Sequence, residues 1–233
     1  MPLFRLSERL EFPPAWLARS DGLLCIGGDL SCERILLAYK NGIFPWFSDN
    51  EPILWWSPEP RLVLFPEDIH ASKSLNKNIK QKQFDIRVNT AFEKTIRACA
   101  QSRKTGLGSG TWLVEEMIDA YIELHRLGYA HSIEAWQKAK LVGGLYGICL
   151  GGIFFGESMF STQKNASKVA LVTLANLLNK NSFDLIDCQV TTDHLLSMGA
   201  TEISRNDYLD IIKKSVKRQD IKKDIWFSAD LLP

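Results

Sequence analysis

The sequence of 233 residues has no long apolar run. A membrane-spanning helix needs about 18 consecutive apolar residues, and none of the apolar stretches reaches that length. The first ten residues carry charged side chains where a secretory signal would be apolar. We therefore expect a cytoplasmic protein that makes no contact with a membrane.

Cysteine is scarce and irregularly spaced. The five cysteines occupy positions 25, 32, 99, 149 and 188 and form no CxxC pair. An odd number at such spacings fits neither a zinc ribbon nor a disulfide framework. We expect reduced thiols, mostly buried, and no metal site.

An excess of charge of one sign is also lacking, because 28 basic residues face 27 acidic ones and the formal net charge is +1. A nucleic-acid site would therefore have to come from a local basic patch rather than from the field of the whole molecule. Hydrophobic residues make up 45% and charged residues 24% of the chain. These values are typical of a globular enzyme and exclude a disordered or fibrous protein.

Proline and tryptophan are concentrated at the start of the chain. Most of the nine prolines and four of the seven tryptophans lie in residues 1–60. From about residue 61 the sequence consists of longer segments with a regular apolar period. This change predicts a small N-terminal domain over 1–61 and a larger domain over 62–233.

Periodic patterns predict the helices and strands. Ser31 is a candidate N-cap of a first helix, and Asn41-Gly42 supplies its left-handed stop. Helical spacing predicts further helices over 92–99, 114–127, 166–178 and 207–217. Apolar and aromatic stretches predict strands over 62–64, 85–88, 131–136, 141–149, 153–160 and 185–190. This order indicates a mixed sheet covered by helices, of the α+β or α/β type.

Asp187-Cys188-Gln189 lies inside the last predicted strand. Because side chains alternate along a strand, Asp187 and Gln189 share one face while Cys188 lies on the apolar face. The polar pair should point out of the core, so that substitutions there would open no cavity. Cys188 and His194 could form a nucleophilic pair, but a thiol on an apolar face is typical of a small buried hydrophobe. Asp187 could also be an ordinary surface or salt-bridged carboxylate.

Glu157 is a second charge embedded in an apolar strand. A carboxylate in such a strand needs a partner, either a cationic substrate or an arginine such as Arg205. Glycines crowd the same region, at positions 143, 144, 147, 151, 152 and 156. They allow either the close approach of a ligand or backbone, or bulges and a hairpin turn. No GxGxxG segment opens a helix, so a nucleotide fingerprint is missing.

Nine short motifs follow one another along nearly the whole chain. In the first part they are GGDLS at 27–31, GIFPWF at 42–47 and PILWWSP at 52–58. The others are GTW at 110–112, GYAHSIE at 128–134, LVGGLYG at 141–147, GESMFS at 156–161, NASK at 165–168 and LIDCQ at 185–189. In this order they resemble the leucyl/phenylalanyl-tRNA protein transferase family.

The resemblance implies an α+β fold with a mixed sheet, built from a small N-terminal domain and a C-terminal acetyltransferase (GNAT-like) domain. It also implies that no metal and no cofactor are needed. In agreement, residues 161–165 read Ser-Thr-Gln-Lys-Asn and lack the glycine-rich pyrophosphate loop that a CoA-binding enzyme presents at a helix N-terminus.

The implied reaction is the aminolysis of an ester. The N-terminal amine of an acceptor protein beginning with Lys or Arg attacks the ester that joins leucine, phenylalanine or, less favourably, methionine to tRNA. The added residue marks the acceptor for degradation by the N-end rule pathway. A free α-amine has a pKa of about 8, so a base or proton relay is useful. The resemblance makes Asp187 and Gln189 this relay, with Asp187 as base or orienter, and Glu157 a residue that holds the acceptor.

The resemblance also assigns binding residues. The pocket for the aminoacyl side chain would consist of Leu145, Phe154, Gly156, Met159 and Leu171. Trp46 and Trp112 would hold the 3′ adenosine by stacking, although each alone would be interpreted as core packing. The tRNA backbone would contact a basic cluster, which from its charge alone would be a solvated face. Its members are Lys73, Lys77, Lys80, Lys82 and Arg87.

Two other functions stay open at this point. A CoA-dependent acetyltransferase would share the fold, and a non-catalytic tRNA-binding module would need Asp187, Gln189 and Glu157 only for stability. Residues 105–110, directly before Thr111, form a longer segment than the resemblance leads us to expect and leave the position of Trp112 open. We expect the protein to be a monomer.

Overall fold

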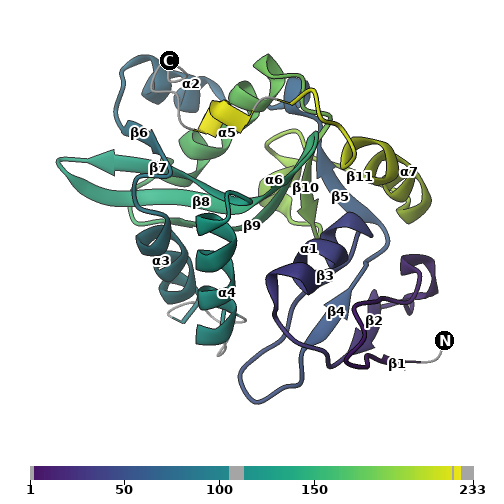
Figure 1. The fold of residues 1–233 in the computed structure, drawn as a ribbon. Coiled ribbons are helices and arrows are strands. Elements are labelled where there is room, and N and C mark those ends of the chain that lie inside the picture. The colour runs from purple at the N-terminus through teal and green to yellow at the C-terminus, as the bar shows by residue number, and fades with distance from the viewer. Residues whose placement is uncertain (1–2, 105–112, 222, 227–233) are drawn as a thin grey trace.

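The computed structural model describes residues 3–104, 113–221 and 223–226, which form two lobes (Figure 1). The N-terminal lobe, residues 3–60, holds a four-stranded sheet in the order β1, β2, β4, β3. Its elements are β1 (Phe4–Arg5), η1 (Ala15–Leu17), β2 (Leu23–Ile26), α1 (Cys32–Lys40), β3 (Phe44–Pro45) and β4 (Leu54–Trp56).

Helix α1 begins and ends where the sequence predicts. The Ser31 hydroxyl accepts a hydrogen bond from the backbone N–H of Arg34 at 3.4 Å and so satisfies one of the free donors of the first turn. After the helix, Gly42 has φ +72°, a left-handed conformation that favours glycine. Ile35 and Tyr39 are buried on the inner face of the helix.

The C-terminal lobe, residues 61–226, contains a mixed seven-stranded sheet in the order β11, β5, β10, β9, β8, β7, β6. Its strands are β5 (Arg61–Leu64), β6 (Asp85–Val88), β7 (Ala130–Gln137), β8 (Lys140–Leu150), β9 (Ile153–Ser161), β10 (Leu185–Gln189) and β11 (Thr201–Ile203). Only β9 and β10 pair in parallel, and the other neighbours are antiparallel. The expected α+β fold with a mixed sheet is confirmed, whereas the GNAT-like classification stays a prediction.

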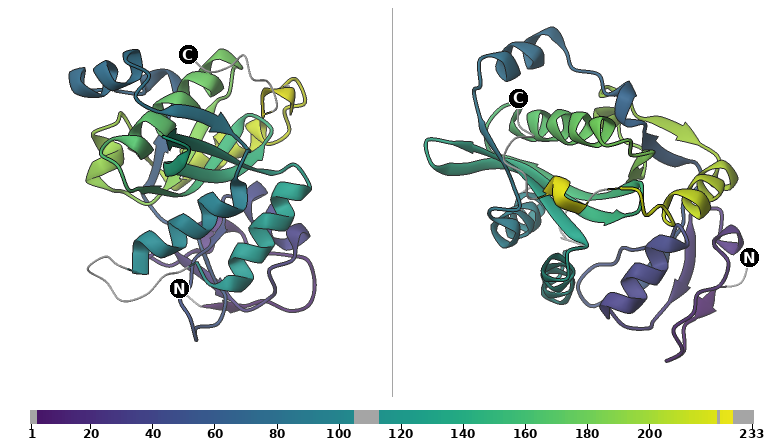
Figure 2. Two further views of the ribbon diagram at one scale, coloured as in Figure 1. Left: turned by 90° about the vertical axis from the view of Figure 1, so that its left-hand side faces the viewer. Right: turned by 45° about the horizontal axis from the view of Figure 1, so that its top comes forward.

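Helices cover both faces of this sheet (Figure 2). Helix α5 (Ala166–Lys180) lies on one face, while α3 (Phe92–Lys104), α4 (Glu115–Arg126) and the N-terminal lobe lie on the other. The remaining helical elements are η2 (Pro66–Asp68), α2 (Lys73–Lys80), α6 (Asp193–Leu196), α7 (Arg205–Ser215) and η3 (Lys223–Trp226). No helix in the described ranges is long and apolar enough to cross a membrane.

Most of the crowded glycines are explained by close packing within the fold. A Cβ atom on Gly143 would lie 2.5 Å from the Cβ of Ala166, and one on Gly147 would lie 2.1 Å from the carbonyl oxygen of Phe155. Gly156 differs, because its nearest neighbour would be the carbonyl oxygen of Asp187 at 3.4 Å. Only Gly156 of these three combines open space with a position on a pocket.

The parallel strands β9 and β10 separate partway along their length. They pair from Ile153 and Leu185 as far as Phe155 and Asp187, although β9 continues to Ser161. Gln189 leaves the regular strand geometry with φ +65°, and the pairing of β10 with β5 shifts at the same place. The sheet therefore opens where the sequence places Glu157 and Gln189.

Candidate active site

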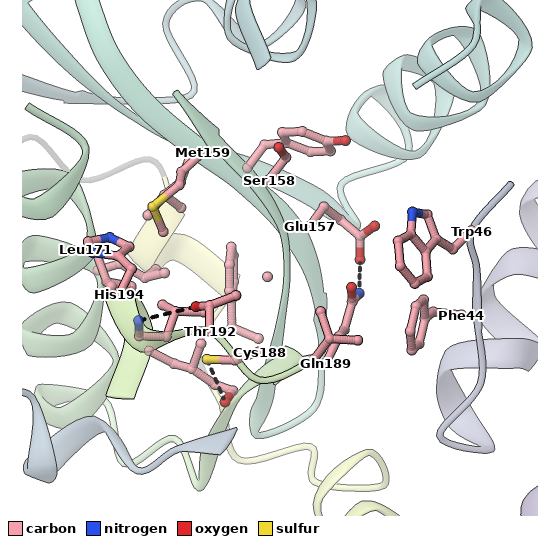
Figure 3. Close-up of a pocket in the computed structure, with 18 of the residues that line it drawn as sticks. Phe44, Trp46, Glu157, Ser158, Met159, Leu171, Cys188, Gln189, Thr192 and His194 are labelled. Carbon is pink, nitrogen blue, oxygen red and sulfur yellow. Dashed lines mark hydrogen bonds between the residues drawn. The ribbon is translucent and has the colours of Figure 1, made fainter. Parts of the chain in front are cut away.

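A cavity of about 280 Å³ lies where β9 and β10 separate, between the C-terminal sheet and strand β3 of the N-terminal lobe (Figure 3). Its lining comes from β3, β8, β9, β10, α5 and α6. The structure brings together eight of the predicted site residues here: Trp46, Leu145, Phe154, Gly156, Glu157, Met159, Leu171 and Gln189.

One end of the cavity is apolar. The four predicted side-chain contacts Leu145, Phe154, Met159 and Leu171 line it, and Leu174 and Ile186 extend this surface. They project from three different elements, β8, β9 and α5, onto the same face of the sheet. The arrangement can enclose a hydrocarbon side chain, aliphatic or aromatic, that is unbranched at Cβ.

Trp46 stands at the other end, with 40% of its surface exposed. Its position is set by Trp56, whose indole N–H donates to the carbonyl oxygen of Trp46 at 2.7 Å and whose ring lies 5.6 Å from the Trp46 ring. A partly exposed indole held in this way is free to stack on a planar ligand. The second predicted tryptophan, Trp112, lies outside the described residues.

Glu157 is buried between the apolar end of the cavity and Trp46. Its carboxylate accepts hydrogen bonds from Tyr39 at 2.6 Å, from Tyr121 at 2.8 Å and from the side-chain amide of Gln189 at 2.9 Å. Burial raises the pKa of Glu157 from 4.5 to about 7, and the negative charge of Asp187 adds to this rise, while the three donors oppose it. A carboxyl group with this pKa can take up and release a proton near neutral pH.

Arg205 does not pair with Glu157. It forms an ion pair with Glu59 at 3.5 Å and donates to the carbonyl oxygen of Ser57 at 2.9 Å. The interpretation of Glu157 and Arg205 as a buried ion pair is therefore wrong. All of the donors to Glu157 that the structure describes are uncharged.

Asp187 is fully buried and its carboxylate is surrounded by donors. One oxygen accepts from Arg61 Nε and from the backbone N–H of Gln189, both at 2.9 Å. The other accepts from Arg61 Nη2 at 2.6 Å and from the Tyr208 hydroxyl at 2.7 Å. The expectation that Asp187 points out of the core is wrong, because Arg61 and helix α7, through Tyr208, cover this face of the sheet. Gln189 is buried as well.

Cys188 and His194 both line the cavity. Burial raises the pKa of the Cys188 thiol well above its ordinary value, which disfavours the thiolate that nucleophilic attack requires. Its sulfur lies 3.8 Å from the carbonyl oxygen of Ile186. The geometry supports the interpretation of Cys188 as a small hydrophobic side chain.

The predicted basic cluster lies away from this cavity. Lys73, Lys77 and Lys80 recur on α2 and line a surface hollow beside it, and α2 packs against α5. Lys82 follows the helix. Arg87 lies on β6, where it pairs with Asp85 at 2.6 Å and covers the ring of Trp136.

Several residues of the site were given no role from the sequence. They are Arg61, Tyr121 and Tyr208 around the two carboxylates, and Phe44 and Ser158 in the cavity wall. Tyr39 and Tyr121 lie within two of the helices predicted from the sequence, the first helix and that over 114–127. A buried tyrosine hydroxyl needs a hydrogen-bond partner, so a tyrosine on the inner face of a helix is the signal that could have led to Glu157.

These features define a two-lobed α+β protein with a candidate active site at the junction of its lobes. Two family models match the chain: the leucyl/phenylalanyl-tRNA protein transferase over residues 63–213, and the N-terminal domain of the same transferase over residues 28–59. The chain belongs to the leucyl/phenylalanyl-tRNA protein transferase family.

Curated relatives agree over nearly the full length. The leucyl/phenylalanyl-tRNA protein transferase of Desulforapulum autotrophicum is 60% identical over 95% of this chain and 96% of its own. The protein of the same name from Syntrophobacter fumaroxidans is 56% identical over 93% of this chain and 92% of its own. A solved domain of a putative lysylphosphatidylglycerol synthetase from Agrobacterium fabrum is 8% identical, with a TM-score of 0.42 over 87% of this chain and 63% of that one.

Proposed function

We propose that this protein transfers leucine, phenylalanine and, less well, methionine from aminoacyl-tRNA to the N-terminal amine of proteins that begin with Lys or Arg. It does so in the cytoplasm, as a monomer and without metal or cofactor, and the product is a substrate of the N-end rule pathway. The observation that supports this best is the single cavity that joins an apolar end, the carboxylate of Glu157 and the exposed ring of Trp46.

The donor fits this cavity from end to end. The leucine or phenylalanine side chain occupies the apolar end beside Met159 and Leu171, and the 3′ adenosine of the tRNA stacks on Trp46. The ester that joins them then lies near Glu157. Gln189 donates to Glu157 and keeps its carboxylate directed at this position.

Glu157 acts as the general base. The acceptor amine attacks the carbonyl carbon of the ester, a C–N bond forms, and the C–O bond to the ribose oxygen breaks. The proton leaves the amine nitrogen for Glu157 and passes to the departing ribose oxygen, which becomes a hydroxyl again. With a pKa of about 7, Glu157 can perform both transfers near neutral pH.

Asp187 is a positioning residue in this mechanism. Arg61 neutralises its charge, and its four hydrogen bonds leave no oxygen lone pair for a proton from the substrate. One of these bonds fixes the backbone of Gln189 in its left-handed conformation. The net negative charge at the polar end of the cavity is therefore that of Glu157, which attracts the cationic acceptor.

The test is to mix the protein with leucyl-tRNA and a peptide that begins with arginine, and to look for the peptide extended by one leucine by mass spectrometry. Peptides that begin with Asp or Gly, and valyl-tRNA as donor, are the controls, and we expect little extension with them. Equal extension of all peptides would contradict the acceptor preference. Binding of tRNA without any extension would reassign the protein as a tRNA-binding module.

A further inference from the structure

Tyr39, Tyr121 and Glu157 form a closed ring of short contacts between oxygens. The Tyr39 hydroxyl oxygen lies 2.6 Å from Oε1 of Glu157, and the Tyr121 hydroxyl oxygen lies 2.8 Å from Oε2. The two hydroxyl oxygens also lie 2.6 Å from each other, and either could be the donor in that contact. All three side chains are buried, and they come from α1, α4 and β9. The ring therefore contains three contacts of hydrogen-bond length.

The number of protons in this ring depends on the charge of Glu157. Each hydroxyl brings one proton and keeps it, because burial and the charge of Glu157 raise the pKa of both tyrosines well above 10. When Glu157 is ionised, two protons serve three contacts, and one pair of oxygens faces each other without a proton between them. When Glu157 is protonated, three protons serve three contacts, and every contact is a hydrogen bond. The geometry therefore fits the protonated form.

The groups around the ring supply no further proton to it. Gln189 donates to Oε1 of Glu157 at 2.9 Å from outside the ring and can do so in both charge states. The titratable and charged groups nearest to the ring on other elements are Tyr146 on β8, Asp187 on β10, Arg61 on β5 and Tyr208 on α7. Arg61 pairs with Asp187 at 2.6 Å. In the described part of the chain, no cation forms a hydrogen bond with a member of the ring.

We propose that Tyr39 and Tyr121 are positioning residues that make Glu157 a better proton acceptor, because their ring of contacts closes only when Glu157 binds a proton. This inference rests on the proposed function. The proton that leaves the acceptor amine becomes the third proton of the ring, and the ring opens again when this proton passes to the ribose oxygen. The tyrosines keep their own protons throughout.

Both tyrosines act through Glu157 and make no contact with the substrate. The Glu157 carboxylate lies in the cavity wall beside Gln189 and Trp46 (Figure 3). Neither tyrosine is among the described residues that line the cavity. Their substitution should therefore change how Glu157 binds a proton and leave KM for leucyl-tRNA close to that of the wild type.

The ring predicts a change of opposite sign from that expected for two independent donors. The loss of an independent donor to the carboxylate would raise the pKa of Glu157. In Tyr39→Phe or Tyr121→Phe, however, the ionised form no longer holds an unbridged pair of oxygens, and the protonated form no longer gains a third hydrogen bond. Both changes favour ionisation and together outweigh the lost donor. We expect the pKa of Glu157 to fall from about 7 to about 6 in each variant.

The experiment measures kcat/KM for transfer from leucyl-tRNA to an arginine peptide between pH 5 and 9. The break near pH 7 in the wild-type profile should move to about pH 6 in each ring variant. Tyr208→Phe is the matched control, because this hydroxyl is equally buried and donates to the other carboxylate, that of Asp187, at 2.7 Å. It should lower the melting temperature about as much as the ring variants, but the break should stay near pH 7.

Glu157→Gln tests the ring without a kinetic assay. The amide of glutamine has a carbonyl acceptor and an N–H donor, so it can close the ring at every pH as protonated Glu157 does. Its melting temperature should exceed that of the wild type at pH 8, and this difference should be smaller in a Tyr121→Phe background, where neither side chain can close the ring. Independent donors predict a larger difference there, because the carboxylate would have lost a donor.

Three results would overturn the proposal. A break that moves to higher pH in a ring variant would mean that the tyrosines are independent donors. An unmoved break in both variants would assign the hydroxyls to packing, and an equal shift in Tyr208→Phe would make the effect a general result of losing a buried hydroxyl. If one ring variant does not fold, the other decides. A wild-type protein that extends no peptide would contradict the proposed function itself, whereas the melting temperatures would still test the ring.

Discussion

Glu157 and Asp187 are buried carboxylates on neighbouring strands, and the charge of their partners separates their chemistry. Asp187 is paired with the buried guanidinium of Arg61, so its charge is neutralised. Glu157 has only neutral donors around it, so burial acts on its pKa without compensation by a cation. The same sheet thus holds one carboxylate that organises the junction and one that can exchange a proton.

The titration of Glu157 predicts the pH dependence of transfer. If Glu157 is the base, as proposed, it must be unprotonated, with a pKa of about 7, and the acceptor amine must be neutral, with a pKa of about 8. The logarithm of kcat/KM should therefore rise with a slope of about 2 below pH 7 and about 1 between pH 7 and 8, and should level above. In Glu157→Gln the steeper part should disappear, and the rate at pH 7 should fall about 100-fold.

The stability of the wild type and of Glu157→Gln gives an independent measure of the pKa of Glu157. Burial raises the pKa of Glu157 in the folded state above the ordinary value of 4.5, so between these pH values the folded protein binds more protons than the unfolded chain. The free energy of unfolding should fall as pH rises from about 5 to 7, and this fall should be smaller in Glu157→Gln. Denaturant titrations at pH 5 and pH 8 measure it. Parallel curves for both proteins would contradict the raised pKa.

Asp187→Asn should act mainly on folding. It leaves the guanidinium of Arg61 buried without a counter-charge, which costs about 3–5 kcal/mol and should lower the melting temperature by roughly 10 °C. Calorimetry measures this loss. The double variant Asp187→Leu with Arg61→Met removes both charges and should regain much of the stability. It should still transfer poorly, because the backbone of Gln189 loses its acceptor. If Asp187→Asn instead had wild-type stability and low activity, Asp187 would be a candidate for the base.

At the scale of elements, the sequence predicted the helices and strands that have a clear apolar period or a capping residue. Helix α1 has a capping serine and a terminal glycine, and strand β6 was predicted over the observed Asp85–Val88. Helix α3 extends five residues beyond its predicted end at Cys99, because no glycine or proline stops it there. Helix α2 was not predicted, since only two of its eight residues, Leu75 and Ile79, are apolar, and this stripe is too short to stand out in the sequence.

The lysines of α2 have their own prediction. Lys73, Lys77 and Lys80 recur at helical spacing and so lie on one face of the helix. If this face contacts tRNA phosphates, replacing all three by alanine should weaken binding and reduce the dependence of log Kd on log salt by about one unit per lysine. Filter binding at several salt concentrations measures both effects. Turnover at saturating tRNA should hardly change.

A matched variant tests whether this effect is local. Three lysines at the end of α7 carry the same total charge in another part of the C-terminal lobe: Lys213, Lys214 and Lys217. Their replacement by alanine should leave the salt dependence close to that of the wild type. Equal changes in both triple variants would mean that the lysines of α2 are an ordinary solvated surface.

At the scale of the whole molecule, residues of both lobes form the candidate active site. Tyr39 of α1 reaches Glu157 across the junction, and Arg61 covers the ring of Phe44 at 4.8 Å while its Nη1 donates to the carbonyl oxygen of Gly42 at 3.4 Å. Strand alternation correctly separated Asp187 from Cys188 in the sequence. It could not show what covers the face of Asp187, because Arg61 lies 126 residues away along the chain and Tyr208 belongs to a different element 21 residues away, and no local pattern reports either contact.

Trp46 tests whether the N-terminal lobe takes part in substrate binding. Trp46→Ala removes a ring that is 40% exposed, so the melting temperature should stay unchanged. Stacking on a base is worth about 1–3 kcal/mol, so KM for leucyl-tRNA should rise about 5- to 150-fold, with kcat at saturation nearly unchanged. Trp16 is the matched control, because it lies in the same lobe, is 60% exposed and does not line the cavity.

The donor can also be shortened to separate the adenosine site from the basic helix. An aminoacyl ester of adenosine alone carries the 3′ end but none of the phosphates that α2 would contact. Trp46→Ala should impair transfer from this donor as strongly as from leucyl-tRNA, whereas the triple variant of Lys73, Lys77 and Lys80 should use it like the wild type. If Trp46→Ala and Trp16→Ala gave the same KM with both donors, the N-terminal lobe would have no part in holding the adenosine. The cavity would then bind its donor through the C-terminal sheet alone.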